Sequence, residues 1–98
     1  MVSAMAGMKS SVLKALAHPT RREVIRLLRS GDKTAGELAA EFDAALSTMS
    51  GHFSVLKSAG LIQGRRDHST ITYTLNVSVL EETLMEIMEL FDLGADDA

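Results

Sequence analysis

The sequence predicts a mainly helical domain with a small β-hairpin near its C-terminal end, assembled as a homodimer. Three observations lead to this fold class. Apolar residues recur at helical spacing in short segments up to residue 60, a two-residue alternation follows within residues 61–75, and a helical pattern returns at residues 78–93. A chain of 98 residues has the length of one domain, residues 1–98, and builds only a modest core of its own, which favours oligomerisation.

Two helices are predicted before residue 31. The first spans residues 8–17, after a start at residues 1–7 that is expected to be disordered. Its apolar positions are Val12, Leu13 and Leu16. Pro19 ends this helix, because proline lacks the amide hydrogen and disfavours helix at the residue before it, and proline also suits the first turn of the next helix. The second helix is expected to stop at Ser30-Gly31, where glycine accommodates a left-handed cap.

The next two helices form a predicted helix-turn-helix over residues 34–58. Thr34 and Glu37 have the spacing of a capping box and start the third helix. A short connector leads to the fourth helix, for which Ser47 is the expected N-cap and Gly60 the end signal. The residues expected in the buried stripe of the fourth helix are Met49, Phe53, Val55 and Leu56.

A β-hairpin is predicted within residues 61–75. The segment at residues 70–75 alternates threonine with isoleucine, tyrosine and leucine, which is typical of a half-buried strand. Residues 61–66 supply its antiparallel partner. A turn at residues 66–69 is expected to join the two strands.

The last predicted helix carries a wide apolar face. Ser78 and Glu81 form a second capping-box pattern, the helix is expected over residues 78–93, and the acidic end at residues 94–98 is expected to be disordered. The apolar side chains extend past the hairpin that could cover them, so we expect burial between two subunits, at about 25 cal/mol per Å². The alternative is that the first and last helices only complete the core of a monomer. The residues expected at the dimer interface are Val12, Leu13, Leu16, Leu80, Leu84, Ile87, Met88 and Phe91.

Two short helices followed by a hairpin have the layout of a winged helix-turn-helix. The segment LAHPTRR at residues 16–22 resembles the opening motif of the ArsR-type bacterial repressors, and TMSGHFSVLKSAGLI at residues 48–62 is similar to the recognition helix of that family and its exit. The resemblance covers residues 18–75. It implies a homodimeric repressor that binds double-stranded DNA, with the first and last helices at the dimer interface, the fourth helix in the major groove and the hairpin on the flanking minor groove or backbone.

The fourth helix contains most of the expected DNA-binding residues. Short hydroxyl side chains let a helix lie deep in a groove and bond to base edges or phosphates, whereas a solvated helix face is usually richer in Glu, Lys and Ala. The candidates on this helix are Ser47, Thr48, Ser50, Gly51, His52, Ser54 and Lys57. Lys57 is expected to contact phosphate. The residues expected to read bases are Thr48, Ser50, Gly51 and His52.

Two of these positions have a second interpretation. His52 is equally consistent with a contact to phosphate and with a cap on a neighbouring helix. Gly51 departs from the family, which often has a bulkier polar or basic residue at this position. A glycine inside a helix costs about 0.5–1 kcal/mol relative to alanine, and it either permits a close approach to DNA or weakens a base contact.

Three arginines outside the fourth helix are further candidates for phosphate contacts. Arg65 and Arg66 are neighbours on a predicted strand and face opposite sides, so at most one is expected to face DNA directly. The alternative for this pair is a charged edge strand that prevents aggregation. Arg22 is the third candidate, with a surface salt bridge to Glu23 as its alternative. Asp67 at the predicted turn would repel phosphate.

The charge distribution is uneven along the chain. The stretch from Lys9 to Arg66 holds ten bases and five acids, a balance of +5, whereas the chain from Asp67 onward holds eight acids and no base, a balance of −8. A basic part and an acidic tail indicate two surfaces with different partners. DNA is the partner expected for the basic part.

Several classes of function are excluded by what the sequence lacks. It has no cysteine, so disulfides, thiolate metal sites and thiol nucleophiles are absent. The three histidines are too far apart in sequence to form a helical ligand pair, and Glu82, Glu86 and Glu89 are expected to form a solvated face. We therefore expect no metal site and no cofactor. No catalytic motif is present either, so an enzyme is not expected.

The remaining expectations concern location and control. The longest apolar run has three residues, which excludes a membrane-spanning helix and a signal peptide. The absence of cysteine is compatible with a cytoplasmic protein, and the resemblance implies a bacterial one. An alternative to the repressor is a protein-interaction module built on the same fold. A third hypothesis is a repressor that a regulatory protein partner sequesters from DNA.

Overall fold

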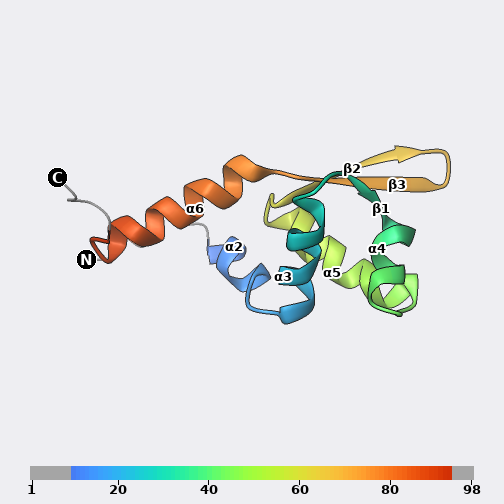
Figure 1. Cartoon of the computed structure of the whole chain (residues 1–98), viewed down its shortest axis with the longest axis horizontal. Helices are drawn as coiled ribbons and strands as arrows, with labels where there is room; N and C mark the ends of the chain where they lie inside the picture. The colour runs from blue at the N-terminus through green and yellow to red at the C-terminus, as the bar shows by residue number, and fades with distance from the viewer. Residues whose placement is uncertain (1–9, 94–98) are drawn as a thin grey trace.

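The structure, a computed structural model, describes residues 10–93 (Figure 1). The disorder predicted at residues 1–7 and 94–98 falls outside the described residues, as does the start of the first predicted helix. The elements in chain order are α2 Ser10–Ala15, α3 Pro19–Leu28, β1 Lys33–Thr34, α4 Ala35–Glu41, α5 Leu46–Ser58, β2 Ile62–Asp67, β3 Thr70–Leu75 and α6 Val77–Leu90. The hairpin β2–β3 and the helix α6 extend in opposite directions from a body formed by α2 to α5 (Figure 1).

Helix α3 begins at Pro19, as predicted, whereas α2 ends at Ala15, two residues before the predicted end. His18 is the N-cap of α3, and its Nδ1 accepts a hydrogen bond of 3.1 Å from the backbone N–H of Thr20. Helix α3 ends at Leu28, earlier than predicted. The expectation that Gly31 caps this helix is wrong, because the chain leaves the helix through right-handed turns and Gly31, with φ 144°, lies beyond them.

The capping box that starts α4 is confirmed. The backbone N–H of Glu37 donates to Oγ1 of Thr34 at 3.1 Å, and the N–H of Thr34 donates to Oε1 of Glu37 at 2.8 Å. The helix ends in a Schellman-type turn in which Asp43 adopts a left-handed conformation with φ 50°. This turn directs the chain into α5 and fixes the angle between the two helices of the motif.

Helix α5 begins at Leu46, and the prediction that Ser47 caps it is wrong. Ala45 has the extended backbone of an N-cap, and its carbonyl accepts the N–H groups of Thr48 and Met49 at 3.0 and 3.1 Å. Ser47 therefore lies inside the first turn. The predicted end signal is confirmed. Gly60 adopts φ 78° and completes a Schellman motif that returns the chain toward the sheet.

The sheet has three strands in the order β1-β3-β2, all antiparallel. The predicted hairpin is present, with Ile62 opposite Leu75 and Asp67 opposite Thr70. Its turn is shorter than predicted, because pairing continues to Asp67 and leaves only residues 68–69 in the turn. The strand β1 was not predicted. It has two residues, too few to show an alternation, and it is defined only by its pairing with Tyr73 and Thr72.

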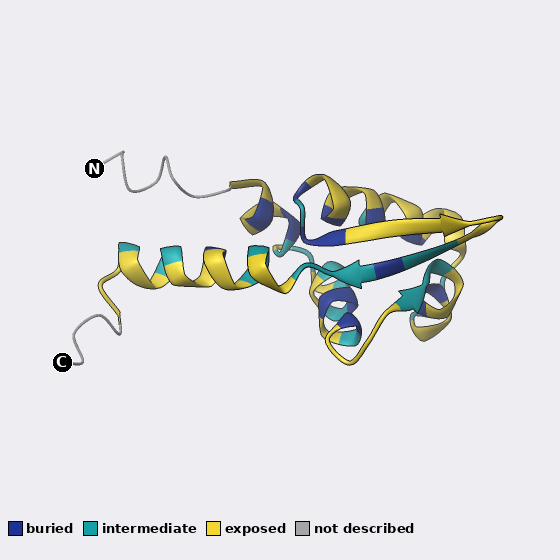
Figure 2. Cartoon of the chain, turned by 90° about the horizontal axis from the view of Figure 1, so that it is seen from above, coloured by how far each residue is buried: buried dark blue, intermediate teal, exposed yellow. Residues whose placement is uncertain are grey.

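The core lies where the helical body meets the sheet (Figure 2). Its buried members come from α2, α3, α4, α5, the turn after α5 and the strands β2 and β3: Val12, Ala15, Val24, Ile25, Leu28, Leu38, Ala39, Met49, Phe53, Leu56, Ala59, Leu61, Ile62 and Tyr73. The stripe predicted for α5 is confirmed at three of its four positions. Val55 is 39% exposed, because it lies away from the side of the helix that carries Phe53.

Helix α6 begins at Val77, so the predicted capping box at Ser78 is wrong. Asn76 is the N-cap and makes no side-chain capping bond, and Ser78 already lies inside the helix. The helix ends at Leu90 rather than at Leu93. Thr83 is buried, and its hydroxyl donates to the carbonyl of Val79 at 2.9 Å. Most of the helix surface is exposed in the single chain (Figure 2).

Candidate nucleic-acid interface and dimer face

The outer face of α5 is formed by small side chains. Ser47, Ser50, Gly51 and Ser54 recur at helical spacing on the side opposite the buried Met49 and Leu56, and all four are exposed. A Cβ atom added to Gly51 would meet no atom within 4 Å, so this point of the helix is open. A face without long side chains allows another surface to approach the helix backbone closely.

Lys57 and Thr48 lie on the two flanks of this outer face. Both are exposed, and Lys57 is in the last turn of the helix, where a positive charge interacts favourably with the helix dipole. Among the expected DNA-binding residues of α5, six are thus exposed and point away from the core. The six are Ser47, Thr48, Ser50, Gly51, Ser54 and Lys57.

His52 is placed differently from its neighbours on α5. It is half-buried, and its ring lies 4.5 Å from the ring of His18, centroid to centroid. The guanidinium of Arg21 lies 3.4 Å from its Nδ1. Burial lowers the pKa of His52, and the charges of His18 and Arg21 lower it further, so the neutral ring is favoured. Within the described residues His52 makes no hydrogen bond to a helix end; its ring lies tilted beside His18, which is the residue that caps α3.

The hairpin presents its two arginines on opposite faces. Arg66 shares a face with Tyr73, which packs against α5, whereas Arg65 lies on the other face beside Thr72. Both are exposed. Asp67 and His68 occupy the tip, with 3.8 Å between a carboxylate oxygen of Asp67 and Nε2 of His68. Burial raises the pKa of the Tyr73 phenol, and Arg66 acts weakly in the opposite direction.

Arg22 and its predicted partner do not meet. The guanidinium of Arg22 donates to the carbonyl of Leu16 at 2.9 Å and so supports the turn between α2 and α3. Glu23 instead pairs with Arg26 on the same helix, and this bidentate contact lowers the pKa of the Glu23 carboxyl. Glu23 therefore forms a surface salt bridge, but with Arg26 and not with Arg22.

An apolar stripe runs along the exposed side of α6. Leu84, Met88 and Phe91 are 50%, 44% and 64% exposed, and they recur at helical spacing next to the half-buried Leu80 and Ile87. Leu13 of α2 is also exposed, whereas Leu16 is half-buried. Val12 differs from the rest of the predicted dimer residues, because it has no exposed surface in the single chain and packs in its core.

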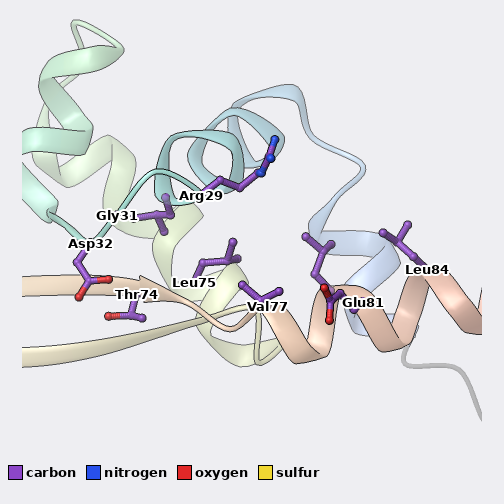
Figure 3. Close-up of a pocket in the computed structure, with 10 residues that line it drawn as sticks. Arg29, Gly31, Asp32, Thr74, Leu75, Val77, Glu81 and Leu84 are labelled. Atoms are coloured by element: carbon purple, nitrogen blue, oxygen red, sulfur yellow. The ribbon is translucent and has the colours of Figure 1, made fainter.

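A cavity of about 310 Å³ adjoins the first turns of this stripe (Figure 3). Its apolar wall includes Leu75 at the end of β3 and Val77, Leu80 and Leu84 of α6. Polar groups from β3, α6 and the segment after α3 also line it: Thr74, Glu81, Arg29 and Asp32. The cavity therefore extends the uncovered apolar surface from α6 toward the end of α3.

Arg21 is the functional candidate that sequence reasoning missed. It lies in the motif at residues 16–22, but nothing in the sequence pattern indicated that it contacts other helices. Its role depends on which backbone carbonyls and which ring it reaches, and those belong to α2 and α5. No sequence pattern reports such a contact across three elements.

Two other features are absent from residues 10–93. No group of three or more histidine, aspartate or glutamate side chains in this range is arranged to hold a metal ion. Within the same range, none of the helices has the length and apolar character needed to cross a membrane.

The arrangement of α4, α5 and the hairpin is a winged helix-turn-helix, and comparisons with known proteins agree. Residues 16–65 match the family described as a helix-turn-helix domain. The transcriptional repressor SdpR of Bacillus subtilis is 35% identical over 90% of this chain and 98% of its own length. The crystal structure of a "possible transcriptional regulator for arsenical resistance" superposes with a TM-score of 0.75 at 36% identity, covering 83% of this chain and 84% of the other.

A third relative was solved as an assembly. The solution structure of the homodimeric winged helix-turn-helix DNA-binding domain Mb0332 from Mycobacterium bovis is similar at 26% identity, with a TM-score of 0.72 over 92% of this chain and 83% of the other. The chain belongs to the ArsR family of winged helix-turn-helix, DNA-binding transcriptional regulators. It is therefore a regulator and not an enzyme, and the resemblance noted in the sequence is confirmed.

Proposed function

We propose that this protein is a transcriptional repressor that binds an inverted-repeat operator as a homodimer. The two α5 helices would lie in successive major grooves, about one helical turn or ~34 Å apart. The observation that carries this proposal is the exposed outer face of α5, where serines and Gly51 leave the helix backbone accessible between two polar flanks. Repression follows from occupying the promoter in the bacterial cytoplasm.

The residues of the interface divide into two roles. Thr48, Ser50 and Gly51 read bases, because they lie on the exposed side of α5 with short side chains that reach base edges. Lys57 and at least one arginine of the hairpin contact phosphate, which fixes the register of the protein on the duplex. Arg66 is favoured over Arg65 for this contact, because it lies on the face of the hairpin that packs against α5. Ser47 and Ser54 are placed to bond phosphate oxygens.

Dimerisation follows from the apolar surface of α2 and α6. Leu84, Met88 and Phe91 are each at least 44% exposed in the single chain, and monomeric proteins rarely leave such a contiguous stripe uncovered. The homodimer of the M. bovis relative supports the same assembly for this chain. In the dimer, the acidic side of α6 lies away from DNA, where its charge does not oppose binding.

Control of this repressor does not depend on a metal ion. The chain has no cysteine, so it offers no thiolate ligand to a transition metal. Its last helix has no histidine, so that helix offers no imidazole ligand either. Operator affinity is expected to be the same with a chelator and with added zinc. A zinc-dependent change in affinity would contradict this part of the proposal.

Selection of duplexes from a random pool tests the function directly. The enriched sequences are expected to contain an inverted repeat. Lys57→Ala is expected to weaken binding to all sequences to a similar extent and to flatten the salt dependence, whereas Ser50→Ala changes discrimination at particular base pairs. Lys14→Ala removes the same charge from α2 and serves as the control. If both α5 variants bind the operator as the wild type does, α5 is not the helix that contacts the bases.

A further inference from the structure

The side chain of Arg21 connects three helices. Its Nε donates to the carbonyl of Ala15 at 2.7 Å, and one terminal nitrogen donates to the carbonyl of Lys14 at 3.2 Å. These are the last two carbonyls of α2, which ends at Ala15. The carbonyl of Lys14 also accepts the backbone N–H of Ala17 at 3.2 Å, in the turn that follows the helix. Arg21 itself belongs to α3, so it acts as a cap on the C-terminal end of α2, where a cation is also favoured by the helix dipole.

The other terminal nitrogen of Arg21 reaches the recognition helix. It lies 3.4 Å from Nδ1 of His52 in α5. A guanidinium can only donate hydrogen bonds, so the Nδ1 atom facing it is the unprotonated acceptor of a neutral ring. The ring of His52 also lies 4.5 Å from His18, whose own Nδ1 is occupied by the backbone N–H of Thr20. His52 is therefore held between the cap of α3 and the guanidinium that caps α2.

This geometry links two surfaces that the proposed function requires. Helix α2 carries Leu13 on the proposed dimer face, and α5 carries the proposed base-reading residues. We propose that Arg21 is a positioning residue that fixes α5 relative to the end of α2 through His52, and so sets the position of each recognition helix in the dimer. The inference rests on the proposed function for its DNA part, while the contact itself belongs to the free protein.

The first test uses the free protein and needs no DNA. Long-range proton–nitrogen spectra of the histidine rings report which ring nitrogen carries the proton. In the wild type, Nδ1 of His52 is expected to be unprotonated, and Arg21→Gln is expected to shift its signal together with the backbone amide signals of α5. His18 provides the internal reference, because the N–H of Thr20 holds its Nδ1 in both proteins. Unchanged His52 and α5 signals in Arg21→Gln would overturn the proposal.

The second test measures the ratio of operator affinity to affinity for a random duplex. Arg21→Gln is expected to lower this ratio by about ten-fold or more, the scale of losing one charge-assisted hydrogen bond. Arg26→Gln is the matched control, since it removes the same charge from α3, where Arg26 pairs with the exposed Glu23. The control is expected to keep the wild-type ratio. Equal ratios in the two variants would overturn the proposal.

Two additions keep the result interpretable. Thermal unfolding of each variant separates a loss of positioning from a loss of folding. If Arg21→Gln does not fold, Arg21→Lys takes its place. The lysine keeps the positive charge, but its single ammonium group cannot reach both α2 carbonyls and His52. In a double-mutant cycle, adding His52→Leu to Arg21→Gln is expected to cost no further specificity. A wild-type protein that binds no duplex would reject the proposed function, while the ring spectra would still decide the positioning role.

Discussion

The ring of Phe53 in α5 lies 4.9 Å from the ring of Tyr73 in β3, centroid to centroid, with 43° between the ring planes. Both side chains are buried, so this tilted pair is a packing contact between α5 and the hairpin. Such pairs contribute about 0.5–1.5 kcal/mol beyond the area they bury. The pair therefore contributes to holding the hairpin against α5.

Gly64 is required on the hairpin because of this aromatic contact. It lies opposite Tyr73 in the sheet, and a Cβ at this position would be 3.1 Å from Cε1 of Tyr73 and 3.3 Å from Cγ2 of Ile71. Gly64→Val is expected to lower the free energy of unfolding by about 1–3 kcal/mol through overpacking. Urea titration measures this loss. Gln63→Val, on the exposed opposite face, is the control, and an equal effect of the two variants would refute the packing argument.

Compared with alanine, Gly51 is expected to lower the free energy of unfolding and to favour DNA binding. Gly51→Ala should raise the free energy of unfolding by about 0.5–1 kcal/mol, since the added methyl group meets nothing within 4 Å and alanine is the better helix former. The same variant is expected to bind the operator more weakly, because the methyl group keeps bases away from the helix backbone. Urea titration and a mobility-shift series measure the two effects. Tighter binding by the stabilised variant would contradict a close approach of DNA at Gly51.

The two turns that flank α5 predict opposite responses to substitution. Asp43→Gly is expected to raise the free energy of unfolding by about 0.5–1 kcal/mol, because Asp43 adopts φ 50°, a conformation that glycine adopts without strain. Gly60→Ala is expected to lower it by about 1–2 kcal/mol, because its φ of 78° is unfavourable for a residue with a Cβ. Thermal unfolding reports both changes. Shifts of the same sign for the two variants would show that these turns do not limit stability.

Protonation of His52 is expected to make the fold less stable in mild acid. Burial, His18 and Arg21 lower its pKa in the folded state, whereas an unfolded histidine titrates near about 6.5. The unfolded chain therefore binds a proton more readily, and the free energy of unfolding decreases as the pH falls below about 6.5, until the folded-state pKa is passed. Denaturant titrations over this range should show a smaller decrease for His52→Gln. Identical slopes in both proteins would contradict the assignment.

Much of the fold was predictable because its signals are local. The capping box at Thr34, the proline at the start of α3 and the glycine after α5 each act within one turn, and the structure has all three. The starts of α5 and α6 were misplaced, because a serine at the right spacing is a cap only if its own backbone is non-helical. In both helices the N-cap lies two positions earlier, at Ala45 and Asn76.

The site was predictable only as far as helix periodicity allows. Spacing identified the exposed serines of α5 and the stripe on α6, but it placed His52 among them and Val12 on the dimer face. His52 instead turns toward α3, and Val12 fills the core beneath α2, because both positions are decided by how the helices pack on one another. The contact between Arg21 and His52, 31 residues apart, depends on that packing as well.

The dimer face is tested by introducing a charge. Leu84→Glu is expected to produce monomers and to abolish operator binding, because a carboxylate in a buried apolar interface is not compensated there. Met85→Glu is the matched control, since Met85 is 62% exposed on the same helix but lies off the stripe formed by Leu84 and Met88. Sedimentation measures the assembly of both variants. A monomeric Leu84→Glu that retains full affinity would show that dimerisation is not needed.

The mass of the protein–operator complex tests the central claim most directly. Native mass spectrometry of the wild-type chain with a duplex that carries the selected inverted repeat is expected to show two chains on one duplex, with no appreciable species containing a single chain. A complex of one chain per duplex, or a chain that does not bind the selected duplex, would contradict the account of two recognition helices fixed by α2 and α6.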